Sequence, residues 1–282
     1  ITRAVLKGYD QSLDKDSGPV VLDFPGAPAL LVRGIGDLAD RPSFRTDVLA
    51  PGRAVRFTRP VGGGLTWTRT LRLAEGYRIE LTDRVENDGE HPVDLPSWGI
   101  DLGAMGRQPT EASQRGMVYT GVDILPHGGG KLKHFGKKIR GWFGDVRKEQ
   151  GLDKLPLRIE RRPLGADEDA DWIAAKNKYF VQILRPEDGG AGTVVRAVRE
   201  PAPGELENPA MDPKMTAVAK AWATLEFPDA TLDTGERREV VSHVYIGPKK
   251  YERLSELGFH QEDVMEFGFW SPISKVLLKL LN

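Results

Sequence analysis

Two neighbouring stretches of the sequence, LTWTRTLRL from Leu65 and YRIELTDRVEN from Tyr77, place an apolar residue at almost every second position. A period of two is the spacing of side chains on one face of a β-strand. Because only Ala74, Glu75 and Gly76 separate the stretches, we expect an antiparallel hairpin with one face in water. The apolar face predicted for this hairpin consists of Leu65, Trp67, Leu71, Leu73, Tyr77, Ile79, Leu81 and Val85.

Short runs of strand-forming residues recur along most of the chain. The 32 Gly and 20 Pro divide the sequence into such runs, and none of the runs alternates with a long helical pattern. A parallel βαβ arrangement is therefore not expected. The sequence predicts an all-β fold in which two large antiparallel sheets stack. Further strands are expected near Val20, Ala29, Ala54, Trp172, Thr193, Met215 and Arg238.

The composition excludes several classes of function. The 40 basic and 41 acidic residues nearly balance, so no overall charge attracts nucleic acid, and none is expected as a partner. The chain has no Cys, which removes disulfides, thiol catalysis and thiolate metal sites. The sequence contains no run of 18 apolar residues and no pattern of a signal peptide.

The C-terminal segment, residues 247–282, is expected to be helical and to end at a membrane surface. Ser271 and Pro272 are typical of a helix start, and Lys275 and Lys279 share one face of that helix. Ten helical residues reach about 15 Å, which is half of a hydrocarbon core, so the helix can lie on a bilayer but cannot cross it. Aromatic residues beside a basic amphipathic helix favour this interface. The alternative is a helix that packs on the protein's own core. The predicted membrane-interface residues are Phe267, Phe269, Trp270, Ile273, Val276, Leu277 and Leu280.

The segment 128–150 carries a local excess of positive charge. Its apolar residues fall close to helical spacing, but Gly136, Gly141 and Gly144 each weaken a helix by about 1 kcal/mol relative to Ala. Two interpretations remain open, namely a mobile basic loop and a segment that contacts anionic lipid headgroups. The residues that would contact lipid are Lys131, Lys133, Lys137, Lys138 and Arg140.

No catalytic or cofactor motif is present. The chain lacks the GxSxG elbow, the Walker A loop and a GxGxxG run that leads into a helix. His127 and His134 lie in the basic segment without neighbouring carboxylates in the sequence, so we expect no metal site there. We expect no cofactor.

Short motifs connect the chain to a known family. WIAAKNKYF from Trp172, the hairpin from Leu65 and the ending FGFWSPISKVLLKLLN resemble the periplasmic domain of the YidC family of membrane protein insertases. The positions that carry this resemblance most directly are Trp172, Asn177, Tyr179, Phe180, Gly247 and Pro248.

The resemblance implies a twisted antiparallel β-supersandwich, similar to that of galactose mutarotases, with C-terminal helices. It divides the chain into a β-supersandwich domain, residues 1–246, and the helical segment, residues 247–282. It further implies a non-catalytic domain on the periplasmic side of the bacterial inner membrane. The expected partners are the Sec translocon with its accessory subunits, nascent inner-membrane proteins and the membrane surface.

A mutarotase-like sugar enzyme is the alternative function, because the same fold carries such enzymes. Mutarotation needs an acid and a base that converge on the sugar ring oxygen and the anomeric hydroxyl. His91 and His243 are the candidate acids. The aromatic residue expected after His91-Pro92 is replaced by Val93, which disfavours this alternative.

Overall fold

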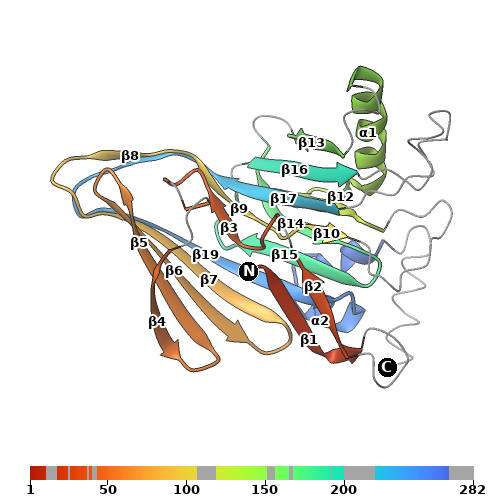
Figure 1. Ribbon diagram of the computed structural model, residues 1–282, viewed down its shortest axis with the longest axis horizontal. Helices are drawn as coiled ribbons and strands as arrows, with labels where there is room; N and C mark the ends of the chain where they lie inside the picture. The colour runs from red at the N-terminus through yellow and green to blue at the C-terminus, as the bar shows by residue number, and fades with distance from the viewer. Residues whose placement is uncertain are drawn as a thin grey trace.

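The computed structural model describes most of the chain, and its strands form two large antiparallel sheets and two small ribbons (Figure 1). The predicted all-β supersandwich is thus confirmed. The predicted membrane-interface residues, 267–282, and the start of the strand expected near Met215 lie outside the described residues. The described ranges are 1–10, 18–24, 26–36, 38–39, 43–106, 119–150, 156–164, 168–190, 192–199 and 220–266.

The larger sheet has nine strands, and every neighbouring pair is antiparallel. At one end, strands from the N-terminal half form a run of hairpins, which twists away from the second sheet in Figure 1. In spatial order the strands are β12 (Lys133–His134), β11 (Gly121–Pro126), β14 (Ala170–Lys176), β15 (Phe180–Pro186), β19 (Arg237–Pro248), β7 (Arg78–Asn87), β6 (Leu65–Ala74), β5 (Ala54–Gly62) and β4 (Arg45–Ala50).

The smaller sheet has six strands and packs against β11 and β14 of the larger one through β16 (Gly192–Arg199) and β17 (Lys220–Phe227). Ile173, Leu184 and Leu225 belong to the apolar core between the sheets. Two ribbons complete the β-structure, β1 (Arg3–Asp10) with β2 (Pro19–Asp23) and β8 (Val93–Leu95) with β18 (Ala230–Leu232). The six strands are β13 (Leu157–Arg161), β16 (Gly192–Arg199), β17 (Lys220–Phe227), β9 (Trp98–Asp101), β3 (Leu31–Arg33) and β10 (Met105–Gly106).

The predicted hairpin is present, with one local difference. Leu65, Trp67 and Leu81 are buried on one face of β6 and β7, as the alternation predicts. The pairing of Ala74 with Arg78 moves the loop one residue along, to residues 75–77. Tyr77 therefore lies in the turn with a φ of 69°, where a bulky residue is rare, and not at an inward position of the strand.

The basic segment contains a helix, α1 (Gly136–Gln150), which packs against β11 and β13. The interpretation of residues 128–150 as a loop is therefore wrong from Gly136 onward. Ile139, Phe143 and Val146 are buried against the core, while Lys137 and Lys138 are exposed. This burial offsets the cost of three glycines because most of a helix's stability in proteins comes from packing its apolar face.

Two short helical elements follow β19, α2 (Tyr251–Glu256) and a 3₁₀ helix, η2 (Gln261–Met265). Among the described residues, no helix combines the length and apolar character needed to cross a bilayer.

Candidate functional site

After β19 the chain returns over the outer face of the nine-stranded sheet. Strands β11, β14, β15 and β19 present apolar side chains on this face, opposite to the core between the sheets, and Leu254 of α2 and Val264 of η2 complete a second core with them. The segment from α2 to η2 is therefore part of the folded body and has a fixed position on the sheet. The buried residues of this second core are Leu125, Leu132, Trp172, Ala174, Val181, Ile183, Tyr245, Leu254 and Val264.

The turn between β14 and β15 is held by Asn177. Its Oδ1 accepts hydrogen bonds from the backbone N–H groups of Tyr179 (3.0 Å) and Phe180 (2.8 Å), and its Nδ2 donates to the carbonyl of Gly106 at 2.9 Å. An Asn side chain that bonds to the backbone two residues on is typical of a tight turn. Three of the residues that carry the family resemblance therefore make one structural unit. The strand expected near Trp172 is therefore followed directly by a second strand, β15, across this turn.

Gly247 and Pro248 lie opposite this unit on β19. Val181 pairs with Gly247 and Phe180 pairs with Pro248, while the N–H of Lys249 donates to the carbonyl of Tyr179 at 2.7 Å. A Cβ at Gly247 would lie 2.8 Å from the ring of Tyr245, so only glycine fits. The Tyr245 hydroxyl donates to the carbonyl of Pro248 at 2.7 Å, and burial raises its pKa.

Trp172 fixes the middle of the C-terminal segment. Its side chain is fully buried in the second core, and its Nε1–H donates to the carbonyl of Phe259 at 2.8 Å. The guanidinium of Arg185 lies 4.0 Å from the centre of the Phe259 ring, and burial lowers the pKa of Arg185. Phe259 and His260 have φ values of 54° and 58°. Such left-handed residues persist where the surrounding structure holds them.

Four ionisable side chains meet at the end of the described segment, and we call Asp123, His134, Lys176 and Glu266 the exit cluster. Lys176 Nζ lies 2.5 Å from Asp123 Oδ2 and 3.4 Å from Glu266 Oε2. His134 Nδ1 lies 2.9 Å from Asp123 Oδ1 and 3.2 Å from Glu266 Oε1. Asp123 and Lys176 are buried, so each needs the other's charge.

Lys176 also forms a hydrogen bond to the backbone of the C-terminal segment. Its Nζ donates to the carbonyl of Val264 at 3.0 Å. Because Trp172 and Lys176 lie four residues apart on the same face of β14, one strand holds the C-terminal segment at two points, Phe259 and Val264. The last described residue, Glu266, therefore has a fixed place on the outer face of the nine-stranded sheet.

The exit cluster also contains three potential metal ligands. Ligand atoms of Asp123, His134 and Glu266 lie within 4.8 Å of one another. The ammonium of Lys176 lies against the same carboxylates and supplies the positive charge that a cation would bring. The residues therefore fit a network of ion pairs that attaches Glu266 to the sheet better than they fit a metal site. His134, expected to lack carboxylate neighbours, has two in space.

The predicted lipid-contact residues lie on and before α1. Lys131, Lys137 and Lys138 are exposed, with Lys138 Nζ 5.0 Å from the centre of the Phe135 ring. Lys133 is ion-paired with Glu168 at 2.7 Å, and Arg140 is half-buried. Three of the five predicted cations, Lys131, Lys137 and Lys138, are thus exposed.

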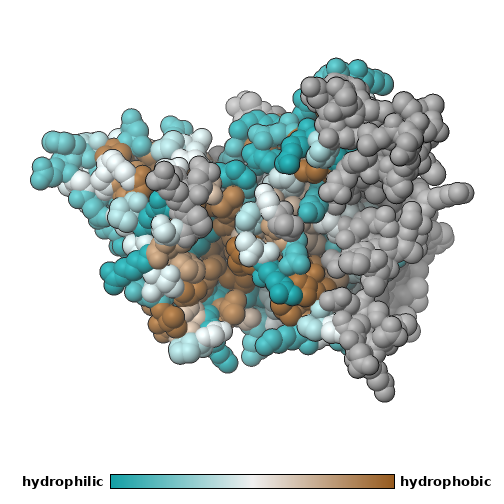
Figure 2. Space-filling view, viewed as in Figure 1, coloured by the Kyte–Doolittle hydropathy of each residue, from teal (hydrophilic) through white to brown (hydrophobic). Residues whose placement is uncertain are grey.

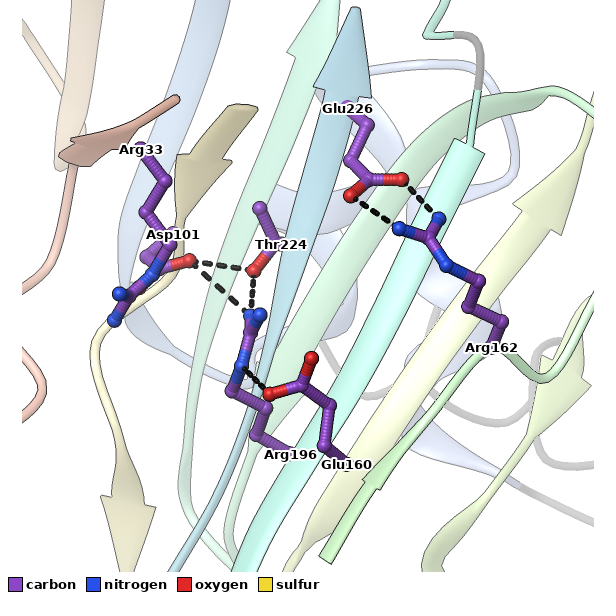
Figure 3. A network of polar contacts seen from close by, with 7 residues as sticks. All are labelled: Arg33, Asp101, Glu160, Arg162, Arg196, Thr224 and Glu226. Carbon is purple, nitrogen blue, oxygen red and sulfur yellow. Dashed lines mark hydrogen bonds and ion pairs between the residues drawn. The ribbon is translucent and has the colours of Figure 1, made fainter. Parts of the chain in front are cut away.

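A second polar network lies on the outer face of the six-stranded sheet (Figure 3). The buried carboxylate of Asp101 lies 2.5 Å from Arg33 Nε and accepts a hydrogen bond of 2.5 Å from Thr224 Oγ1. Arg196 lies 3.6 Å from Asp101 and 2.8 Å from Glu160. The negative charge of Asp101 is therefore balanced by two arginines, Arg33 and Arg196, which suits a structural role. The scattered acids of the sequence gave no sign of this network.

At the edge of the same face, Arg162 and Glu226 form a bidentate ion pair. The hydrogen bond to Glu226 raises the pKa of Arg162.

The two histidines named as candidate mutarotase acids lie in different surroundings. His91 lies in the exposed turn after β7, and its carbonyl accepts a hydrogen bond from Asn87 Nδ2 at 2.8 Å. His243 Nε2 lies 3.0 Å from Glu187 Oε1.

The whole chain matches one family model. Residues 1–280 match the model described as the YidC periplasmic domain. The chain belongs to the YidC periplasmic domain family. The YidC membrane protein insertase of Ruegeria pomeroyi is 24% identical over 300 residues, which cover 98% of this chain and 45% of that protein. The YidC insertase of Geobacter sp. strain M21 is 26% identical over 232 residues, 81% of this chain and 35% of that protein. The chain thus spans less than half the length of these relatives.

Solved structures of the same general architecture are more distant. A GalM/aldose epimerase homologue from C. elegans superposes with a TM-score of 0.41 at 11% identity and covers 74% of this chain and 69% of its own. A putative aldose 1-epimerase from Klebsiella pneumoniae has a TM-score of 0.39 at 11% identity and covers 77% of this chain and 56% of its own.

Proposed function

We propose that this chain is the non-catalytic periplasmic domain of an inner-membrane insertase. It assists the insertion and folding of nascent inner-membrane proteins, alone or with the Sec translocon and its accessory subunits. The family membership and the names of the relatives support this proposal.

The observation that carries the mechanical part of the proposal is the exit cluster. Lys176 and His134 bind Glu266, the residue directly before the aromatic, amphipathic sequence of residues 267–282. A segment attached to the body at that point reaches the bilayer with a defined orientation. The domain thereby orients the membrane-facing sequence relative to its sheets, and partners that bind the sheets are held near the membrane.

Vesicle binding tests the membrane contact. In flotation with liposomes, we expect the full chain to bind and the variant Trp270→Asp/Leu277→Asp to lose most of that binding, because a charge at the interface opposes burial of the apolar face. A chain that ends at Glu266 retains the exit cluster and is expected to behave like the double variant. Equal flotation of all three proteins would contradict the membrane role.

The exposed cations near α1 provide a second, electrostatic contact in this proposal. Lys137→Glu/Lys138→Glu is expected to reduce binding to vesicles that contain anionic lipid, and salt should reduce the binding of the unmodified chain, because exposed charges are screened over about 8 Å at physiological ionic strength. Lys7→Glu/Arg53→Glu, an equal charge change at exposed positions elsewhere, is the matched control. If both variants lose binding equally, the contact is non-local and the role of α1 is wrong.

A further inference from the structure

Strand β4 forms a free edge of the nine-stranded sheet. In the described part of the chain it pairs with β5 on one side only. Strands β4 to β7, which we call the blade, extend away from the six-stranded sheet in Figure 1. An edge strand presents unpaired N–H and C=O groups that another strand can bind.

The apolar face of the blade becomes exposed toward this edge. Leu81, Leu71, Val55 and Val48 are cross-strand neighbours in one row, and exposure rises from 0% at Leu81 to 67% at Val48. Leu73 on the same face is 58% exposed. Figure 2 shows hydrophobic surface over these strands. Apolar surface that reaches an open sheet edge marks an interaction site.

The residues of β4 are complementary to their own copy in one antiparallel register. If a two-fold axis passes through Thr46, Arg45 lies opposite Asp47 of the second copy, and Asp47 lies opposite Arg45 of that copy. On the other face of the sheet, Val48 lies opposite Phe44, which packs on Phe57 and Trp67 at ring distances of 5.9 and 5.5 Å. Opposite charges and aromatic–β-branched pairs are the cross-strand pairs that stabilise antiparallel strands.

We propose that β4 pairs antiparallel with β4 of a second copy of this chain, about a two-fold axis through Thr46. The two blades then form one continuous sheet, and their apolar faces lie on the same side of it. Each half of the interface presents the same residues, as a two-fold axis requires.

Charge complementarity favours a second copy over an unrelated extended peptide. Charged residues on an edge strand usually oppose pairing, but Arg45 and Asp47 are 3.4 Å apart in one chain and become an alternating row of charges across the axis. The regular pairing of β4 with β5 ends at an irregularity between Val48 and Ala50, which limits the new pairing to residues 44–48. Such a short interface makes a weak, concentration-dependent dimer.

Single cysteines test the register, since the chain has no Cys of its own and every disulfide must join two copies. Directly opposite residues of antiparallel strands have the Cα separation that a disulfide needs. Thr46→Cys, at the axis, is expected to form disulfide-linked dimers at least about tenfold faster than Asp47→Cys, because pairing raises the effective concentration of the two thiols. A mixture of Arg45→Cys and Asp47→Cys should form the mixed dimer.

Asp47→Cys is the matched control because it lies one residue away and its copies are not opposite each other. Equal cross-linking of Thr46→Cys and Asp47→Cys would show random collision and overturn the proposal. Circular dichroism and thermal melting of each exposed-site variant verify that the fold is retained.

Charge reversal in sedimentation equilibrium provides a test without cross-linking. Asp47→Arg places two arginines opposite each other on both sides of the axis and is expected to weaken dimerisation by about tenfold. Arg45→Asp/Asp47→Arg restores the alternation and should restore dimerisation. A monomer at every concentration, or a dimer that Asp47→Arg leaves unchanged, would overturn the proposal, and binding to an extended peptide in its place would identify the edge as a site for another protein.

Discussion

Two buried aspartates, Asp101 and Asp123, are both balanced by positively charged side chains, but the partners come from different parts of the fold. Asp101 lies on the outer face of the six-stranded sheet and Asp123 on the outer face of the nine-stranded sheet, and both side chains are completely buried. The partners of Asp101 are Arg33, Arg196 and Thr224, all from strands of the same sheet. Asp123 is bound by Lys176 of β14 and His134 of β12, and both of these also contact Glu266, which lies beyond the last strand.

The difference shows how a charge pair can stabilise either a sheet or an attachment to it. A buried carboxylate requires a cation, and the cation then fixes the position of its other partners. Around Asp101 those partners belong to the sheet, so the network holds strands together. Lys176 binds the carbonyl of Val264 and the carboxylate of Glu266, so the exit cluster holds a segment that would otherwise leave the surface.

The largest effect is expected for Lys176→Met. It leaves Asp123 buried with only His134 beside it, and loss of one partner of a buried ion pair costs about 3–5 kcal/mol of unfolding free energy. Urea denaturation measures this loss. Hydrogen exchange, compared with the unmodified chain, should increase more in residues 251–266 than in the six-stranded sheet. Lys7→Met, at an exposed position outside the cluster, is the control, with an expected change within about 0.5 kcal/mol.

If Lys176→Met raised exchange uniformly over both sheets, the exit cluster would resemble the Asp101 network, and the proposed difference between the two regions would disappear.

Asp101→Asn should have a smaller effect that spreads over the six-stranded sheet. Arg33 is partly exposed to water and Arg196 keeps its ion pair with Glu160, so both guanidiniums remain compensated when the carboxylate is neutralised. We expect a loss of about 1–3 kcal/mol, the range for weakening a buried hydrogen-bonded group. Exchange should increase in β3, β9 and β16 but not in residues 251–266. Faster exchange confined to the C-terminal segment would contradict the comparison.

The sequence predicted the sheets better than the site. Alternation in β6 and β7, interrupted on the buried face by the ion pair of Arg69 and Asp83, assigns their two faces because one face of that hairpin is exposed to water and the other is buried. In β14 almost every residue is buried on both faces, so WIAAK shows no alternation and gives no direction for Lys176. His134, Lys176 and Glu266 are also far apart along the chain, and only the pairing of β11 with β12 and β14 brings the first two to Asp123.

The residues that carry the family resemblance have a structural role that the sequence did not reveal. Asn177, Phe180, Gly247 and Pro248 build the β14–β15 turn and its pairing with β19, which is the surface that receives α2 and η2. In α1, by contrast, the glycines suggested a loop because local propensity opposes a helix there. The contacts of Ile139 and Phe143 with the core reverse that preference, and such contacts depend on residues distant in the sequence.

The smallest and most local effect is expected for Trp172→Phe. This change removes the hydrogen bond from Nε1 to the carbonyl of Phe259 and keeps an aromatic ring in the second core. Trp98→Phe is the matched control, because Trp98 is also buried but its Nε1 has no hydrogen-bond partner among the described residues. The excess loss of Trp172→Phe over Trp98→Phe should be about 1 kcal/mol, the usual net value of one hydrogen bond. Hydrogen exchange should place that excess in residues 258–266.

Because Trp172 and Lys176 hold neighbouring points of one segment, combining Trp172→Phe with Lys176→Met should cost less unfolding free energy than the sum of the two single changes. Full additivity would mean that the two anchors act independently and that the segment has no cooperative attachment.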